Sequence, residues 1–164
     1  MKRELTVMAG ALALSGCVAN LGDTYTGPAA APELRDNTVA MSAEDIVQAR
    51  RVTYFLSTQA VGQIKAGIAE GGDLRRTRGG AMMLARWAET LPSMFPDGTN
   101  VEGSRALPSV WSDRADFEAA AEEYRLAALA IAESAQTGDR QATNDAFMAM
   151  AGKCQACHQS YREE

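Results

Sequence analysis

The chain has 164 residues, of which 46% are hydrophobic, enough for one domain with a buried core and too few for two. Its formal net charge of −5 argues against nucleic acid or an anionic membrane surface as a partner. Neither value indicates a fold.

Residues 1–16 have the pattern of an export signal. A short basic segment precedes an apolar run from Leu5 to Leu14, which is too short to span a bilayer as a permanent helix. The run ends in Leu-Ser-Gly-Cys, which resembles the bacterial lipoprotein box, whose cysteine becomes the lipidated first residue of the mature protein. We therefore predict lipidation at Cys17 and attachment to a membrane through lipid alone. The alternative is an ordinary signal cleaved nearby, with Cys17 an incidental thiol.

Residues 17–41 contain glycines, prolines and alanines without a sustained apolar period. This composition predicts a flexible tether between the lipid and the domain. The folded domain is expected to occupy residues 42–164.

A first helix is predicted from Ser42 to the Gly71-Gly72 pair. Ser42 and Asp45 have the spacing of a capping box, and the glycine pair ends the helix. Small and apolar residues recur at spacings of three and four, as on one face of a helix. They are Ile46, Ala49, Thr53, Leu56, Ala60, Ile64 and Gly67.

A second helix is predicted from Asp73, which caps it, to Pro92, which stops it. Gly79-Gly80 within it is costly for a helix and indicates a close helix contact or a kink. Its predicted buried face consists of Leu74, Thr77, Ala81, Leu84, Ala88 and Leu91.

Residues 92–111 hold three of the five prolines and are predicted as one long loop, which in a compact domain is usually functional. A third helix, capped by Ser112 or Asp113, follows and ends at Gly138-Asp139, where a tight hairpin opens a fourth. The third helix presents Phe117, Ala121, Tyr124, Ala128, Ile131 and Ala135 on one face, and the fourth presents Thr143, Phe147, Met150, Cys154 and Cys157.

Four amphipathic helices with mostly short connections predict an all-α, antiparallel four-helix bundle. Many positions on the predicted buried faces are alanine or threonine, so the core is small for a domain of this size. A buried porphyrin would fill that space.

Cys154-Gln-Ala-Cys157-His158 has the pattern by which a c-type haem is attached. Each thiol would form a thioether with one haem vinyl group, and the adjacent imidazole would ligate the iron. Three alternatives are weaker. A redox Cys-x-x-Cys pair normally lies near a βαβ pattern, which is absent from the sequence. A zinc site needs about four ligands, and only Cys17 remains. Chance occurrence is the third.

Several motifs together resemble the cytochrome c′ family over roughly residues 42–162. The attachment motif lies near the C-terminus, whereas ordinary small cytochromes c carry it near the N-terminus. The other matching pieces are Leu91-Pro92 with Phe95, Pro-Asp-Gly-Thr at 96–99, Val-Trp-Ser-Asp at 110–113 with Phe117, residues 135–139, and Tyr161-Arg162 after the motif.

The resemblance implies a four-helix bundle with one covalent haem c, Cys154 and Cys157 as its attachment sites and His158 as the axial iron ligand. It also implies a periplasmic protein that binds nitric oxide and carbon monoxide, transfers single electrons to an unidentified redox partner, and is not an enzyme. Members are often homodimers through the first two helices.

His158 is the only histidine, so ligation by two histidines within one chain is excluded. The sixth position is then methionine, another side chain, an exogenous ligand or vacant. A methionine ligand would make a low-spin electron carrier, and Met82, Met83 and Met94 are its candidates. Matching the first helix to the family pattern places Tyr54 over the distal face of the haem, with Phe55 and Val61 lining the same region. The alternatives are that Tyr54 is a boundary residue with its hydroxyl in water, or that it ligates the iron as tyrosinate.

Four arginines are candidates for contacts with the haem. The family pattern places Arg50 at its arginine, and both Arg50 and Arg51 could bind the haem propionates, since guanidinium groups suit carboxylates. Arg51 and Arg105 depart from the residues that the family more often has, and a solvated surface arginine is the alternative at both. Arg162 lies four residues after His158 on the same helical face, where the family has a basic residue.

Overall fold

The computed structural model describes residues 40–163. The predicted signal segment, Cys17 and nearly all of the predicted tether lie outside these residues. The described elements are α1 (Ala43–Ile68), α2 (Leu74–Thr90), the 3₁₀ helix η1 (Leu91–Met94), α3 (Ser109–Ser112), α4 (Arg114–Thr137) and α5 (Arg140–Tyr161).

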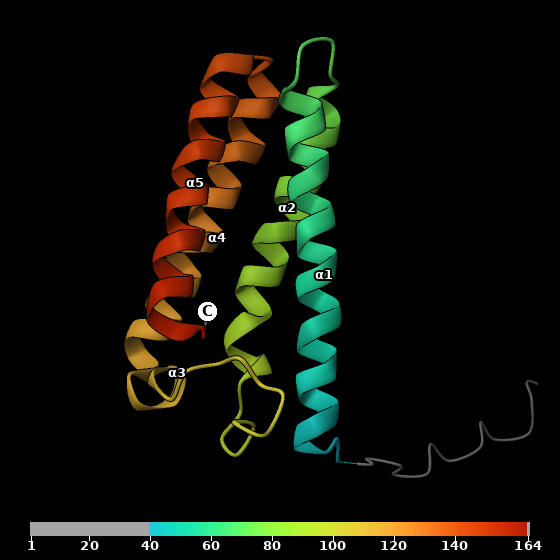
Figure 1. Ribbon diagram of the computed structural model, residues 1–164. Coiled ribbons are helices and arrows are strands. Elements are labelled where there is room, and N and C mark those ends of the chain that lie inside the picture. The colour runs from blue at the N-terminus through green and yellow to red at the C-terminus, as the bar shows by residue number, and fades with distance from the viewer. Residues whose placement is uncertain (1–39, 164) are drawn as a thin grey trace, which may run out of the picture. The chain divides into compact units, whose positions relative to one another are not determined.

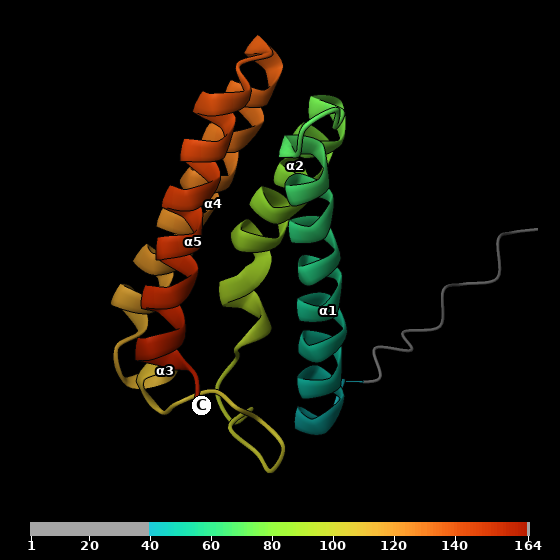
Figure 2. The same cartoon turned by 45° about the horizontal axis from the view of Figure 1, so that its top comes forward.

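The four long helices form an antiparallel bundle, as the sequence predicts (Figure 1). Two views show α1 beside α2 and α4 beside α5 (Figures 1 and 2). Among residues 40–163 no helix is both long enough and apolar enough to cross a membrane.

The predicted helix starts are confirmed at all four long helices, and three of them have a side-chain capping bond. Ser42 and Asp45 form the capping box of α1, in which the Asp45 amide donates to Ser42 Oγ at 3.1 Å. The Asp73 carboxylate accepts from the Arg75 amide at 2.9 Å, and the Asp139 carboxylate from the Ala142 amide at 2.9 Å. Asp113 precedes α4 but makes no side-chain capping bond. Gly138 ends α4 with a φ of 81°, a left-handed conformation that glycine adopts easily.

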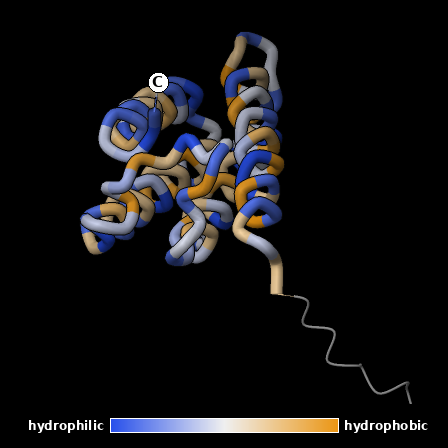
Figure 3. The backbone as a smooth tube through the Cα atoms, turned by 60° about the horizontal axis from the view of Figure 1, so that its bottom comes forward, coloured by the Kyte–Doolittle hydropathy of each residue, from blue (hydrophilic) through white to orange (hydrophobic). Residues whose placement is uncertain are grey.

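The prediction of one loop over residues 92–111 is partly wrong, because its two ends are helical. η1 extends the second helix by a turn through Pro92, whose missing amide costs nothing in the first turn of a helix. The four-residue α3 precedes α4. The segment between them crosses the end of the bundle, and Figure 3 looks onto that end.

The buried face of α1 differs from the prediction in the N-terminal half of the helix. Ala60, Ile64 and Gly67 are buried as expected, but Leu56 is 50% exposed. In the N-terminal half the helix instead buries Val47 and Arg50. The reason is that a cavity lies at this end of the bundle, and Val47 and Arg50 line it.

Gly80 allows α1 and α2 to pack closely. A Cβ added to Gly80 would lie 2.8 Å from the carbonyl oxygen of Ala60, whereas one added to Gly79 would meet no atom within 4 Å. Of the two predicted explanations for the glycine pair, a close helix contact is confirmed, and Gly80 alone makes it.

The helices do not close evenly around the bundle axis. α2 packs against α1 and α4, and α4 packs against α5, whereas α1 and α5 make few contacts with each other. At one end Arg140 of α5 joins them, since its guanidinium donates to the carbonyl oxygens of Gly67, Ile68 and Ala69 at 2.7 to 2.8 Å. These are terminal carbonyls of α1 that lack helical partners. The rest of the seam between α1 and α5 is open, and this is where the cavity lies.

Candidate haem site

A cavity of about 610 Å³ lies in the half of the bundle near the loop, within the size range of cofactor sites. Its walls come from all four long helices and from loop residues 103–106. Most of the lining is apolar or aromatic, and includes Val47, Val61, Trp87, Leu91, Phe95, Val110, Phe117, Tyr124, Phe147, Met150 and Tyr161.

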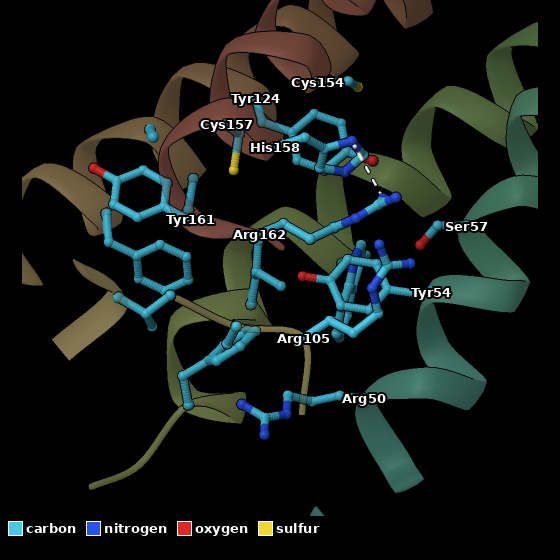
Figure 4. A pocket seen from close by; sticks show the side chains of 18 of the residues that line it. Arg50, Tyr54, Ser57, Arg105, Tyr124, Cys154, Cys157, His158, Tyr161 and Arg162 are labelled. Atoms are coloured by element: carbon cyan, nitrogen blue, oxygen red, sulfur yellow. Dashed lines mark hydrogen bonds between the residues drawn. The ribbon is translucent and has the colours of Figure 1, made fainter. Parts of the chain in front are cut away.

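The α5 wall carries Cys154, Cys157 and His158, and all three line the cavity (Figure 4). Both thiols are half-buried and free. Burial raises the pKa of each thiol, so both remain protonated at neutral pH. Burial, followed by the positive charges of Arg162 and Arg105, lowers the pKa of His158. The imidazole is therefore neutral at pH 7, which is the form that ligates a metal.

The α1 wall carries Tyr54, whose ring points into the cavity (Figure 4). The ring meets Trp87 of α2 edge to face, with centroids 5.4 Å apart and an interplanar angle of 84°. Burial first, and the neighbouring Cys157 second, raise the pKa of Tyr54, although 40% of the residue's surface is exposed. The phenol therefore keeps its proton at neutral pH.

Of the two residues expected near Tyr54, Val61 lines the cavity and Phe55 does not. Phe55 is 63% exposed, because it lies one position beyond Tyr54 and so faces outward from the helix. None of the candidate methionine ligands, Met82, Met83 and Met94, lines the cavity.

Arg50 is a buried guanidinium with one nitrogen unused. The residue is 3% exposed, its Nη2 donates to the Thr99 carbonyl at 2.9 Å, and its charge lies 4.2 Å from the centroid of the Phe95 ring. Nη1 has no hydrogen-bond partner among the described residues. A buried donor without a partner is costly, and it suits a carboxylate brought in by a ligand. Burial lowers the pKa of Arg50, yet arginine remains charged in proteins.

The other three predicted arginines lie at the cavity rim, and each bonds to a neighbour. Arg51 donates to the Gly103 carbonyl at 2.6 Å, and Arg105 donates to the Glu163 carbonyl at 2.7 Å. Arg162 Nη1 lies 3.4 Å from His158 Nδ1. Apart from Phe55, the structure thus brings the predicted haem-site residues of α1, the loop and α5 to one cavity.

The loop is fastened to the end of α5. Ala106 and Arg162 form an isolated antiparallel bridge, in which the Leu107 amide donates to the Tyr161 carbonyl at 3.0 Å and the Glu163 amide donates to Arg105 at 2.8 Å. Since loop residues 103–106 line the cavity, this bridge holds one wall in place.

Val47 and Trp87 are wall residues that the sequence patterns do not indicate. The sequence predicts Phe117 and Tyr124 on a buried helix face and Tyr161 in a motif, but it does not indicate that all three line a cavity. An aromatic residue on the buried face of a helix has the same sequence pattern whether it packs against other side chains or lines a cavity.

The residues present fit a covalent haem. The cavity is large and apolar, two thiols and a neutral imidazole lie on one wall, and a buried guanidinium has a free donor for a propionate. Within residues 40–163 no three His, Cys, Asp or Glu side chains gather as a ligand set for a metal ion, so the zinc interpretation gains no support.

A family model described as Cytochrome C′ matches residues 45–162, which spans the whole bundle and the attachment motif. The chain belongs to the cytochrome c′ family. Members of the family carry one covalently bound haem c, the cofactor that the cavity fits.

Individual cytochromes c′ agree with this assignment. The cytochrome c′ of Rhodospirillum rubrum is 31% identical over 140 residues, covering 83% of this chain and 95% of that protein. A solved cytochrome c′ with an unusual ligand-controlled dimer dissociation superposes with a TM-score of 0.69 at 27% identity, covering 76% of this chain and 98% of the other. The nitrosyl complex of a variant from Alcaligenes xylosoxidans superposes with a TM-score of 0.66 at 26% identity, covering 74% and 98%.

Proposed function

We propose that this cytochrome c′ holds a five-coordinate haem iron that binds small gases, chiefly nitric oxide, and also carries single electrons without turning over a substrate. Cys154 and Cys157 would form the thioethers and His158 the axial bond. The observation that carries the proposal is the α1 wall of the cavity, where Tyr54 lies and where no methionine or histidine is found among the described residues.

An apolar cavity suits this function for a steric and an electronic reason. The protein supplies no strong ligand from the α1 side, so that side is left for an exogenous one. The ring of Tyr54 restricts the same region, and we propose that it admits a diatomic molecule and excludes larger ones. A nitrosyl complex is known for a variant of the similar Alcaligenes protein, which supports nitric oxide as the ligand class.

The arginines would bind the haem propionates and tune the axial histidine. Arg50 offers a buried Nη1 without a partner, and Arg51 and Arg105 lie at the rim. Arg162 lies beside His158, where its charge disfavours the imidazolium form. We assign propionate binding to Arg50 first, because an unsatisfied buried guanidinium nitrogen gains most from a carboxylate.

A visible spectrum of the dithionite-reduced protein tests the proposal. We expect a high-spin spectrum that changes on addition of carbon monoxide or nitric oxide. A low-spin spectrum with sharp α and β bands, unaltered by carbon monoxide, would support the alternative of an electron carrier with a methionine ligand. Leucine substitution of Met82, Met83 and Met94, one at a time, would then identify that ligand.

We further propose that the protein forms a homodimer through α1 and α2. Val52, Phe55 and Leu56 of α1 and Met83 of α2 are exposed apolar side chains on these two helices. Burying such a surface is favourable. Dimer behaviour in a cytochrome c′ of the same fold supports this arrangement.

The proposed location is the periplasm, with residues 1–16 removed, lipid on Cys17, residues 17–41 as the tether and residues 42–164 as the bundle. The signal-like N-terminal pattern supports this, as does haem attachment, which in bacterial c-type cytochromes takes place outside the cytoplasm. Fractionation of cells that express the full chain tests the anchor. Cys17→Ala should move the protein from the membrane to the soluble periplasmic fraction, and retention in the membrane would contradict lipidation.

A further inference from the structure

The hydroxyl groups on the α1 wall differ in whether their protons already make hydrogen bonds within the protein. Ser57 Oγ donates to the Thr53 carbonyl at 3.0 Å, and Thr58 Oγ1 donates to the Phe55 carbonyl at 2.7 Å. Both hydroxyls line the cavity, but their protons serve the backbone of their own helix. They therefore offer a bound molecule only lone pairs.

Tyr54 is different, because its hydroxyl makes no hydrogen bond to another described residue and points into the cavity (Figure 4). The ring is held edge-on against buried Trp87, with centroids 5.4 Å apart. A rigid ring places its hydroxyl at a defined point, and a donor placed in advance loses little entropy on bonding.

Burial of this hydroxyl favours donation over ionisation. Burial, and Cys157 after it, raise the pKa of Tyr54, while the positive charges of Arg50 and Arg162 oppose that rise. The hydroxyl thus keeps its proton in a cavity whose positive charges favour electron density on a molecule bound nearby.

We propose that the Tyr54 hydroxyl donates a hydrogen bond to the outer atom of a diatomic ligand bound on the α1 side of the cavity, and so selects for ligands that carry negative charge on that atom. This rests on the proposed five-coordinate function. The ring would set which molecules enter, and the hydroxyl would set how long a polar one stays.

Two substitutions separate the ring from the hydroxyl. Tyr54→Phe keeps the bulk of the ring and removes the donor, so ligand association should be unchanged and nitric oxide should dissociate about two- to tenfold faster, as expected for one net hydrogen bond. Tyr54→Leu removes both, and association should also become faster. Ser57→Ala is the matched control, because its hydroxyl proton is already bonded to Thr53.

The direct readout is the infrared C–O stretch of carbon monoxide bound to the reduced, haem-loaded protein. A hydrogen bond to the outer oxygen lowers this frequency, so Tyr54→Phe should move the band to higher wavenumber while Ser57→Ala leaves it in place. An unchanged band in Tyr54→Phe, or a shift in Ser57→Ala alone, would overturn the donor role and leave the five-coordinate function standing. Failure of the wild-type protein to bind carbon monoxide would overturn both.

Discussion

At the scale of single residues, Arg50 departs from the usual pattern of an amphipathic helix, because it is a charged residue on the buried face that lines the cavity. An amphipathic helix normally places apolar residues on its buried face, and a buried charge needs a partner. Arg50 satisfies part of this need through the Thr99 carbonyl and the face of the Phe95 ring. The remaining nitrogen has no partner within the described residues, so it is free to donate to an anionic group in the cavity.

We predict that Arg50→Met lowers both the reduction potential of the haem and the stability of the protein. Loss of a nearby positive charge favours the oxidised iron, which carries one more positive charge. Loss of the bond to Thr99 should cost about 1.5–3 kcal/mol, as for hydrogen bonds of charged groups. Potentiometric titration and chemical unfolding measure the two effects. Arg51→Met is the control, because Arg51 is exposed and should change both quantities less. Equal effects of the two substitutions would contradict the distinction.

At the scale of helices, the two glycines at 79 and 80 lie next to each other in sequence and have opposite surroundings. A side chain at Gly80 meets the backbone of α1, and a side chain at Gly79 meets open space. Backbone cannot move aside as a flexible side chain can, so the spacing of α1 and α2 depends on Gly80.

We predict that alanine at these two positions changes stability in opposite directions. Gly79→Ala should stabilise the protein by about 1 kcal/mol, because alanine favours the helix. Gly80→Ala should destabilise it by about 1–3 kcal/mol, since a Cβ 2.8 Å from the Ala60 carbonyl oxygen forces the helices apart. Urea unfolding of both haem-loaded variants measures this, and the same sign for both would refute the close contact.

The helices could be predicted closely because their ends are encoded locally. A capping box at Ser42, a capping aspartate at Asp73 and a left-handed glycine at Gly138 each act within one turn. The short helices η1 and α3 could not be predicted, because four residues are too few to show a period. The burial of Arg50 on α1 also could not be predicted, since a periodic pattern assigns buried positions to apolar residues.

The candidate site was predictable where covalent chemistry fixes residue types. Cys154, Cys157 and His158 stand out because only this spacing suits haem attachment. The aromatic wall did not stand out, because Trp87 and Tyr124 come from separate helices and meet only through the tertiary fold. Phe55 was wrongly expected there, because one residue along a helix turns a side chain by about 100°.

At the scale of the whole molecule, the cavity makes stability depend on the cofactor. Protein produced without haem attachment should unfold at a temperature at least about 10 °C lower than the loaded protein. The reason is that the side chains around the large apolar cavity then lack the contacts that the haem would make with them. Thermal unfolding followed by circular dichroism measures this. Cys154→Ala, which keeps one thioether and the histidine, is the control and should lose less. Similar melting of loaded and haem-free protein would show that the core is stable alone.

The proposed dimer leads to a further prediction at this scale. Phe55→Glu should shift the protein towards monomer, because it places a charge in the apolar surface of α1 and α2. Leu126→Glu on α4 is the matched control, since Leu126 is 52% exposed but lies on a different face, and it should leave the dimer intact. Sedimentation velocity distinguishes the two, and a monomeric wild-type protein would rule the dimer out.

The sparse seam between α1 and α5 also bears on how the chain folds. α1 with α2, and α4 with α5, are hairpins of successive helices, whereas α1 and α5 are the long helices farthest apart in sequence. Contacts between distant segments slow folding, because a long loop must close before they form. Because α1 and α5 make few contacts, the chain can fold mainly through contacts between helices that are close in sequence. A haem held in the cavity would then supply the missing long-range connection between the first helix and the last, because both helices line that cavity.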